Sequence, residues 1–341
     1  MTNPLRRFEQ TARLEHCDCV PVALVASSSY VPSYAGMDYR DYYALPSRWH
    51  EANVTLARRF PDVLLLPGFC VEWGMAQLAG AYGVRMHFHR DQPPSCSPLV
   101  KDVRCWANVA PIDPHEHGPL PLILRQQRVA EEMLQAEGFG GHFAFSWGPM
   151  SLASAVMGIT GLMEAIVDEP QATARTLESM TTSSIRWLEA QLEVLREPAG
   201  IFIGDDVSGL VSTCHFKELV LPRLQRLFAG FDGLLKVYHN DTPCRHLVQS
   251  LPDAGFDLWH FSHELDIGSV AREIGHRVAL MGNVPPLSVG LRGSPEDVRR
   301  SAQECIRSAE GRSLVLSFGG GIPCGSPPEN VDALVEATVG F

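Results

Sequence analysis

The chain has 341 residues, with 28 Lys and Arg against 39 Asp and Glu, 45% apolar residues and nine cysteines. This composition is that of an ordinary globular chain, and the formal net charge of −11 argues against nucleic acid or an anionic membrane surface as a partner. The length fits either two average domains or one large α/β barrel.

The sequence contains no segment typical of a membrane or secreted protein. The longest apolar stretches, Val20–Ser27 and Val63–Gly68, are far shorter than the roughly 20 residues that span a bilayer. Glu9 and Gln10 interrupt any apolar signal region near the start. Nine cysteines is an odd number without the spacing of a disulfide framework, so at least one thiol is free. We therefore expect a cytoplasmic protein without a membrane segment.

Short apolar or β-branched runs alternate with longer amphipathic stretches along the whole chain. In chain order the expected strands are Val20–Ala26, Val63–Leu66, His142–Trp147, Gly200–Gly204, Leu234–Tyr238, Phe256–Phe261, Arg277–Met281 and Ser313–Phe318. The expected helices are Pro46–Arg59, Pro121–Glu137, Leu162–Arg196, Ser212–Phe231, Thr242–Asp253, Asp266–Ile274, Ser294–Ala309 and Pro328–Thr338. Such an alternation in one chain is typical of a (β/α)8 TIM barrel.

An open doubly wound sheet of the Rossmann type is the alternative fold. It is disfavoured because no Gly-x-Gly-x-x-Gly opens a helix after the first strand, while Gly138-Phe-Gly-Gly141 precedes a strand instead. The segment of about residues 69–120 is too long for a loop between a strand and a helix. We predict a single domain over residues 1–341, in which this segment is an insertion that covers the barrel mouth.

In such a barrel, reactive groups gather at the carboxyl ends of the strands. His239 and Asp241 follow the fifth expected strand two residues apart, so both side chains point the same way, toward the mouth. An imidazole and a carboxylate so placed can bind a divalent metal or act as an acid/base pair. The alternative is that His239 caps the strand and Asp241 caps the next helix.

Three other strand ends carry candidates. Asp205 and Asp206 follow the fourth strand; one of them faces the site while the other caps the next turn, and we assign Asp205 to the site. Glu72 follows the second strand in a loop with a cysteine and a tryptophan, where desolvation would raise its pKa, unless it is a solvated loop acid. Cys324 lies in the glycine-rich segment after the last strand and is either a thiolate ligand or an inert thiol.

Three further motifs lie less favourably. His16-Cys-Asp-Cys19 precedes the first strand, at the bottom face of the barrel, and His115-Glu-His117 lies in a Pro-rich segment without a partner cluster. The run Gly319-Gly-Gly321 follows the eighth strand and could cradle a phosphate, but no basic residue accompanies it. We therefore expect neither a metal at the first two motifs nor a phosphate at the third.

Several short motifs occur in a fixed order along the chain. They are Gly148-Pro-Met-Ser-Leu-Ala153, Met157-Gly-Ile-Thr160, Gly204-Asp-Asp206, Phe216-Lys-Glu218, Leu221-Pro222, His239-Asn-Asp-Thr242, Leu280-Met-Gly-Asn-Val284, Gly319-Gly-Gly-Ile-Pro323 and Pro328-Glu-Asn330. Together they resemble the uroporphyrinogen decarboxylase superfamily, which includes cobalamin-linked methyltransferases. The resemblance covers essentially the whole chain and implies a (β/α)8 barrel.

The branch of the superfamily is chosen by what the motifs lack. True decarboxylases carry an arginine-rich segment after the first strand that holds substrate carboxylates, whereas this chain has Ser27-Ser-Ser-Tyr-Val-Pro32 and no arginine until Arg40. The branch similar to methylcobamide:coenzyme M methyltransferases holds zinc with His-x-Cys and a loop cysteine. Here Asp241 replaces the first cysteine and glycine occupies the loop position, a harder ligand set that disfavours thiol alkylation.

The remaining branch moves a methyl group from a small or aromatic donor, such as a methyl ether, to a corrinoid (cobalamin) cofactor on a partner protein. The resemblance implies a zinc ion bound by residues at the strand ends and by the loop thiol: His239, Asp241, Glu72 and Cys324. The implied acid/base residues are Glu72, Asp205, His239 and Asp241. The implied cofactor contacts are Asn283, Gly320 and Gly321.

Two alternatives to methyl transfer stay open. One is a related lyase that decarboxylates a smaller acid, and the other is a non-catalytic relative that binds a corrinoid or another tetrapyrrole. Fold membership alone does not choose among these functions. The sequence also leaves the oligomeric state open, a homodimer included.

Overall fold

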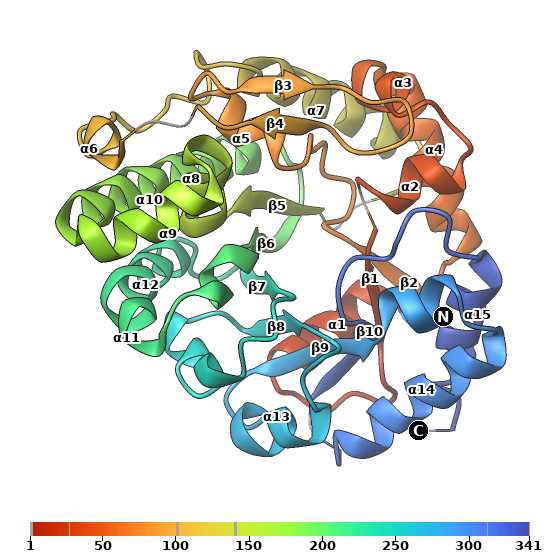
Figure 1. Ribbon diagram of the computed structural model, residues 1–341. Coiled ribbons are helices and arrows are strands. Elements are labelled where there is room, and N and C mark those ends of the chain that lie inside the picture. Colours follow the sequence, from red (N-terminus) through yellow and green to blue (C-terminus); the bar gives the residue numbers. More distant parts are fainter. Residues whose placement is uncertain (1–2, 27, 100–101, 140–141, 312, 341) are drawn as a thin grey trace.

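The computed structural model describes residues 3–26, 28–99, 102–139, 142–311 and 313–340. Eight parallel strands surround one axis, with helices outside them (Figure 1). These strands are β1 (Val22–Val25), β2 (Val63–Leu66), β5 (His142–Trp147), β6 (Pro198–Gly204), β7 (Leu235–Asn240), β8 (Leu258–Phe261), β9 (Ala279–Val284) and β10 (Leu314–Phe318). Each overlaps a strand expected from the sequence, so the TIM-barrel prediction is confirmed.

The strands pair in the order β2-β1-β10-β9-β8-β7-β6-β5. Among the described residues no strand ladder joins the two ends of this series, β2 and β5. A backbone hydrogen bond of 3.2 Å, from the N–H of Phe143 to the carbonyl of Pro67, nevertheless links them. The barrel is therefore nearly closed, and the carboxyl ends of all eight strands meet at one end.

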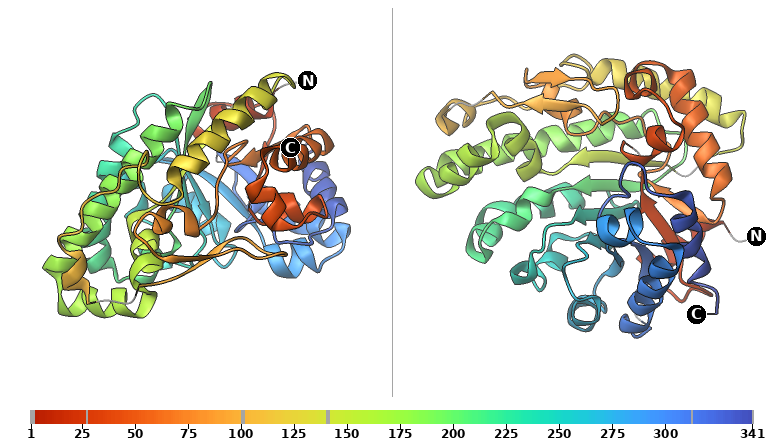
Figure 2. Two further views of the ribbon diagram at one scale, coloured as in Figure 1. Left: turned by 90° about the horizontal axis from the view of Figure 1, so that it is seen from above. Right: turned by 45° about the vertical axis from the view of Figure 1, so that its right-hand side comes forward.

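Helices surround the strands, and α10 and α14 lie on opposite sides of the barrel (Figures 1 and 2). The α-helices outside residues 69–119 are α1 (Pro4–Ala12), α2 (Tyr30–Tyr34), α3 (Tyr39–Ala44), α4 (Pro46–Arg59), α7 (Leu120–Gln135), α8 (Pro149–Met157), α9 (Ile159–Asp168), α10 (Pro170–Leu192), α11 (Thr213–His215), α12 (Leu221–Ala229), α13 (Ile267–Ile274), α14 (Pro295–Ser308) and α15 (Pro328–Glu336). Seven of the eight expected helices overlap these elements, two of them interrupted.

The prediction of an α-helix over Thr242–Asp253 is wrong. This segment forms two short 3₁₀ turns, Arg245–Leu247 and Leu251–Ala254. Pro252 supplies no backbone N–H and disfavours a helical conformation at the residue before it, which explains why no α-helix continues through the segment. The expected helix Leu162–Arg196 is likewise divided at Pro170, which begins α10.

The segment of residues 69–120 contains α5 (Ala76–Gly80), the antiparallel hairpin of β3 (Arg85–His87) and β4 (Ser95–Ser97), and α6 (Val103–Trp106). Its buried residues, among them Leu78 and Trp106, belong to the same hydrophobic cluster as the helices around the barrel. The single domain with an insertion over the mouth stays a prediction.

The alternation of side chains along each strand divides the core into two parts. On β7, Leu235 and Val237 point into the barrel, whereas Tyr238 packs beneath the outer helices. Helix α1 closes the amino-terminal end of the barrel, where Phe8 is fully buried and meets the ring of Phe143 edge-on at a centroid distance of 6.0 Å. The interior is thus apolar at the end that α1 closes.

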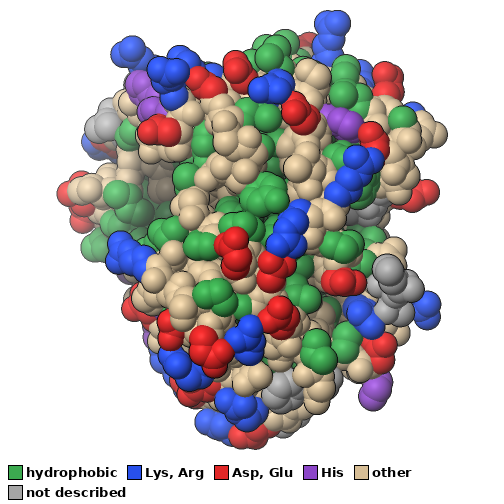
Figure 3. Space-filling view, turned by 90° about the vertical axis from the view of Figure 1, so that its right-hand side faces the viewer, with side chains coloured by type: hydrophobic (Ala, Val, Ile, Leu, Met, Phe, Trp, Pro, Cys, Tyr) green, Lys and Arg blue, Asp and Glu red, His purple; other side chains and the backbone are tan. Residues whose placement is uncertain are grey.

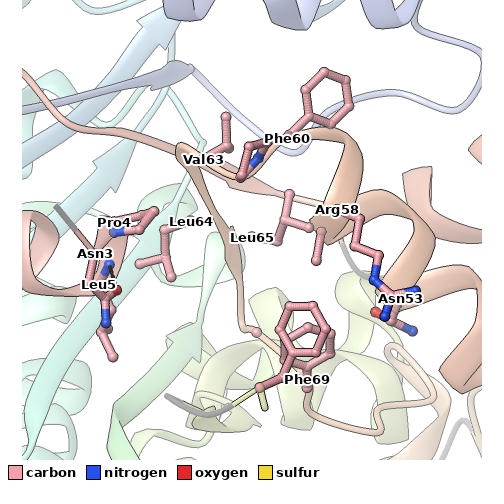
Figure 4. A pocket seen from close by; sticks show the side chains of 14 residues that line it. Asn3, Pro4, Leu5, Asn53, Arg58, Phe60, Val63, Leu64, Leu65 and Phe69 are labelled. Atoms are coloured by element: carbon pink, nitrogen blue, oxygen red, sulfur yellow. Dashed lines mark hydrogen bonds between the residues drawn. The ribbon is translucent and has the colours of Figure 1, made fainter. Parts of the chain in front are cut away.

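An apolar cavity of about 400 Å³ lies beside β2, close to the seam with β5 (Figure 4). Its walls come from the start of α1, from α4, from β2 and from the loop that precedes β5. On the face of the molecule shown in Figure 3, basic and acidic side chains are interspersed rather than gathered into patches of one sign. All nine cysteines lie among the described residues, and each is a free thiol.

No single helix in the described part of the chain is long and apolar enough to cross a membrane. Helices α8 and α9 together reach the required length and composition, but the pair is bent by 111° at the break between them.

Phe8→Ala should lower the free energy of unfolding by about 3–5 kcal/mol, because it removes a buried ring from the closed end of the barrel. Leu122→Ala on α7 is the control, since that side chain is 63% exposed and its loss should change stability by less than about 0.5 kcal/mol. Urea denaturation measures both. If both variants lost similarly little unfolding free energy, the idea that α1 stabilises the barrel by closing its amino-terminal end would be contradicted.

Candidate functional site

The strand ends bring one histidine and two carboxylates together. A ring nitrogen of His239, from β7, and single oxygens of Asp206 and Asp241 all lie within 4.8 Å of one another. Nε2 of His239 is 3.6 Å from Oδ1 of Asp206. His239 is 9% exposed, whereas the two carboxylates reach solvent, so the group is open on one side. We call these three residues the carboxylate–histidine group.

Hydrogen bonds between two loops hold the carboxylate–histidine group in place. The backbone N–H of Asp241 donates to Oδ1 of Asp206 (3.0 Å), and the hydroxyl of Thr242 donates to the backbone carbonyl of Asp206 (2.8 Å). Gly209 packs directly on Thr242, because a Cβ at this glycine would lie 2.8 Å from the Cβ of Thr242. The loops that follow β6 and β7 therefore form one unit.

A buried polar network lies beneath these loops. The amide of Asn240 donates to the backbone carbonyl of Asp205 (3.1 Å) and to the hydroxyl of Ser208 (3.0 Å). The Ser208 hydroxyl is in turn 2.6 Å from the phenol oxygen of Tyr238. All of these side chains are buried, and the network satisfies polar groups that would otherwise be costly there.

A second histidine lies behind the first. His260 stands opposite His239 in the β7–β8 ladder, and the Nδ1 atoms of the two rings are 2.7 Å apart. Nε2 of His260 is 2.8 Å from the backbone carbonyl of Phe318 at the end of β10. His260 is fully buried, and this burial, with a smaller contribution from His239, lowers the pKa of its imidazole to about 3.

Burial also raises the pKa of the Asp206 carboxyl. The adjacent His239 opposes this change, and the like charge of Asp241 adds to it. Two carboxylates held this close favour a cation or a shared proton between them.

Asp205 takes a different position from Asp206. Its Oδ1 accepts the backbone N–H of Ser151 in the first turn of α8 (2.7 Å), and its other oxygen is buried with no hydrogen-bond partner among the described residues. A Cβ at Gly148 would lie 2.5 Å from Cγ of Asp205, so only glycine fits there. Burial raises the pKa of Asp205 to about 7. Asp205 supports the start of α8 and is not part of the carboxylate–histidine group.

Glu72 and Cys324 also lie outside that group. Glu72 is buried, and its Oε2 accepts the backbone N–H of Gly74 at 2.5 Å. Cys324 is exposed, with its Sγ 3.2 Å from the hydroxyl of Ser33. Of the four metal ligands expected from the sequence, the structure brings together His239 and Asp241, and it adds Asp206 to them.

The expected cofactor contacts divide into two kinds. The amide of Asn283 points into the protein and donates to the backbone carbonyls of Leu265 (2.7 Å) and Ser262 (3.3 Å). Gly320 lies against the carboxylate–histidine group, because a Cβ there would be 3.0 Å from Oδ2 of Asp241. Gly321 is next to the end of β1, where its Cβ would be 3.6 Å from the carbonyl of Val25.

A second set of ligand-type atoms lies at the other end of the barrel. The thiols of Cys17 and Cys19 and an oxygen of Asp18 lie within 4.8 Å of one another. Arg7 forms two hydrogen bonds of 3.2 Å with the Asp18 carboxylate. The guanidinium of Arg7 therefore already neutralises the Asp18 carboxylate. Its positive charge opposes the binding of a metal ion at this cluster.

Sequence reasoning assigns Asp205 rather than Asp206 to the site, and it misses His260. The alternation along the strands could have found them. Phe202 faces the barrel interior, so on a continued strand Gly204 and Asp206 share its side, whereas Asp205 shares the outward side of Ile203. Leu258 likewise faces inward, and His260 follows two residues later.

The fold and these residues define a (β/α)8 barrel with a candidate site at the carboxyl ends of its strands. A family model for uroporphyrinogen decarboxylase (URO-D) matches residues 3–340. The chain belongs to this family, which confirms the resemblance seen in its motifs.

The relatives align with this chain over nearly their full length, but at low sequence identity. The uroporphyrinogen decarboxylase of Photobacterium profundum is 24% identical, with 97% of this chain and 95% of that protein covered. That of Coxiella burnetii is 25% identical, with 98% and 94% covered. A solved structure described as a methyltransferase from Methanosarcina mazei superimposes with a TM-score of 0.82 at 21% identity, covering 99% of this chain and 98% of the other.

Asp205 should make the stability of the metal-free protein depend on pH. Its native pKa is above its ordinary value, so the native state retains the proton to higher pH and the free energy of unfolding falls between about pH 4 and pH 7. At about 1.4 kcal/mol per pKa unit, the fall amounts to up to about 4 kcal/mol. Asp205→Asn should flatten the profile measured by urea denaturation at pH 5 and pH 8. Equal falls in both proteins would contradict this assignment.

Proposed function

We propose that this protein is a methyltransferase that moves a methyl group from a small or aromatic methyl donor to a corrinoid on a partner protein, with a zinc ion held by Asp206, His239 and Asp241. The observation that carries the proposal is the convergence of one imidazole and two carboxylates at the open end of the barrel. The likeness to the Methanosarcina mazei methyltransferase supports it.

The carboxylate–histidine group fits a divalent cation. Three protein ligands with one open position are the usual arrangement of a catalytic zinc ion. Gly320 leaves open space beside Asp241, because a Cβ at this position would lie only 3.0 Å from Oδ2 of Asp241. A zinc ion bound there would supply Lewis acidity toward the leaving oxygen of the donor. Oxygen ligands in place of thiolates favour a donor whose leaving atom is oxygen rather than sulfur.

The protein's own acid in this reaction is Glu72. It lies in the loop after β2, at the same end of the barrel as the carboxylate–histidine group, and it is buried. The indole of Trp147 donates to the carbonyl of Gly74 (3.1 Å), which fixes this loop to the end of β5. We assign to Glu72 the proton that the leaving alkoxide or phenolate receives. We assign the approach of the corrinoid to Gly320, which lies against Asp241, and to Gly321, which is next to the end of β1.

The second candidate function is decarboxylation, which the names of the aligned relatives favour. The absence of an arginine-rich segment after β1 argues against uroporphyrinogen as the substrate, because the carboxylates of that molecule would lack their counter-charges. A smaller carboxylic acid is the substrate that this alternative would require.

Metal analysis tests the site. Wild-type protein purified without chelator should hold one zinc ion per chain, whereas His239→Ala and Asp206→Asn should bind zinc more weakly by over about 100-fold, since each removes a ligand. Cys324→Ala should keep its zinc, because that thiol lies outside the group. If His239→Ala still held one zinc ion per chain, the zinc site would lie elsewhere, and the proposed ligand set would be wrong.

Methyl transfer tests the reaction. Incubation with Co(I) cobalamin and methyl ethers, methanol or methylamines should yield methyl-cobalt, followed by its absorbance. Glu72→Gln should slow an unactivated alkyl ether by about 10²–10⁴-fold and a phenolic ether much less, because a good leaving group needs no acid. Glu51→Gln, on the exposed side of α4, is the matched control.

Three outcomes would contradict this mechanism. Equal slowing of both donors would mean that Glu72 only positions the substrate. Release of carbon dioxide without methyl-cobalt would select the decarboxylase. Formation of coproporphyrinogen at about 1 per second or faster would assign to this chain the activity for which its aligned relatives are named.

A further inference from the structure

A line of hydrogen-bonding groups runs through the barrel behind the carboxylate–histidine group. It begins at the backbone carbonyl of Phe318, continues through Nε2 and Nδ1 of His260, and ends at the ring of His239. The two heavy-atom distances, 2.8 Å and 2.7 Å, are those of full hydrogen bonds. Each hydrogen bond therefore contains one proton, and the ring nitrogen that carries it can be assigned.

The Phe318 carbonyl fixes the direction of the whole line. A carbonyl oxygen can only accept, so Nε2 of His260 carries the proton of the first bond. A second proton on His260 would place a cation in a fully buried position, so its Nδ1 is an acceptor. The proton between the two rings therefore belongs to Nδ1 of His239. In neutral His239, Nε2 is then left with a lone pair that faces Asp206 at 3.6 Å.

The geometry points to His260 as a positioning residue: we propose that it holds His239 in the Nδ1–H tautomer, so that Nε2 is presented as an acceptor and the carboxylate–histidine group takes a divalent cation. This inference rests on the proposed function only in naming that cation. Without His260, neutral His239 could place its proton on Nε2 and donate to Asp206, which would oppose a metal ion in that position.

The barrel leaves the His239 ring little freedom to escape this constraint. His239 and His260 are register partners on adjacent strands, so both side chains project into the same interior layer. On β6, the ring of Phe202 stacks against His239 with an interplanar angle of 28° and a centroid distance of 5.9 Å. Orienting partners of this kind typically account for roughly 10–100-fold in metal affinity.

Two substitutions separate hydrogen bonding from packing. His260→Gln keeps one acceptor and one donor, because the amide oxygen can receive the His239 proton while the amide nitrogen donates to the Phe318 carbonyl. His260→Met fills a similar volume with no donor and with only a weakly accepting thioether sulfur. The first variant should retain the function of His260, and the second should lose it.

The first measurement needs no metal and no activity. Nitrogen-15 NMR of imidazole-labelled, metal-free protein, with the His239 signals assigned by their loss in His239→Ala, reports which ring nitrogen is protonated. We expect protonated Nδ1 and unprotonated Nε2 in the wild type and in His260→Gln, and a mixture or the reverse in His260→Met. A protonated Nε2 in the neutral ring of the wild type would overturn the proposal even if no His260 variant folds.

The second measurement is zinc affinity, by competition with a chromophoric chelator and without corrinoid. His260→Met should bind zinc roughly 10–100-fold more weakly, while His260→Gln should stay within about threefold of the wild type. Wild-type affinity in folded His260→Met would overturn the proposal. Because neither measurement uses methyl transfer, failure to methylate cobalamin would refute the proposed function while leaving this inference standing.

Discussion

The site depends on acceptor atoms held closer together than they would stay in water. Asp206, Asp241 and His239 place carboxylate oxygens and an imidazole nitrogen within 4.8 Å, where like charges repel. Such a group persists only if its backbone is fixed and if a cation or proton compensates it. The N–H of Asp241 and the hydroxyl of Thr242 provide the first condition by tying the loops after β6 and β7 together.

That constraint explains why polar side chains are layered beneath the loops. The Tyr238, Asn240 and Ser208 network anchors the backbone of Asp205, which directly precedes the first carboxylate. On the other side, His260 reaches across to the end of β10. The ends of β6, β7, β8 and β10 are thus linked by side chains as well as by the sheet. Displacing any one strand end would displace the ligand atoms.

The sequence predicts the barrel well because burial on both faces of a parallel sheet leaves short apolar runs that stand out between amphipathic stretches. It predicts His239 and Asp241 because they follow such a run directly. The assignment of Asp205 to the site is wrong, because Phe202 points into the barrel and the alternation along the strand brings Asp206, not Asp205, to the same side. His260 is harder to find, because it lies within an apolar strand and gains its meaning only from pairing with β7.

The two ends of the barrel interior have different roles: one stabilises the fold and the other carries the candidate site. Near α1, the inward side chains are apolar, with Phe8 and Phe143 in edge-to-face contact, and this end contributes hydrophobic burial. At the carboxyl ends of β6, β7 and β8 the inward positions carry Asp206, His239 and His260, which contribute less to hydrophobic burial and more to chemistry. A family built on this plan can change its strand-end residues while the apolar end maintains the fold. The chemistry of this chain is therefore to be sought in a few side chains at the carboxyl end of the barrel, above all Asp206, His239 and Asp241.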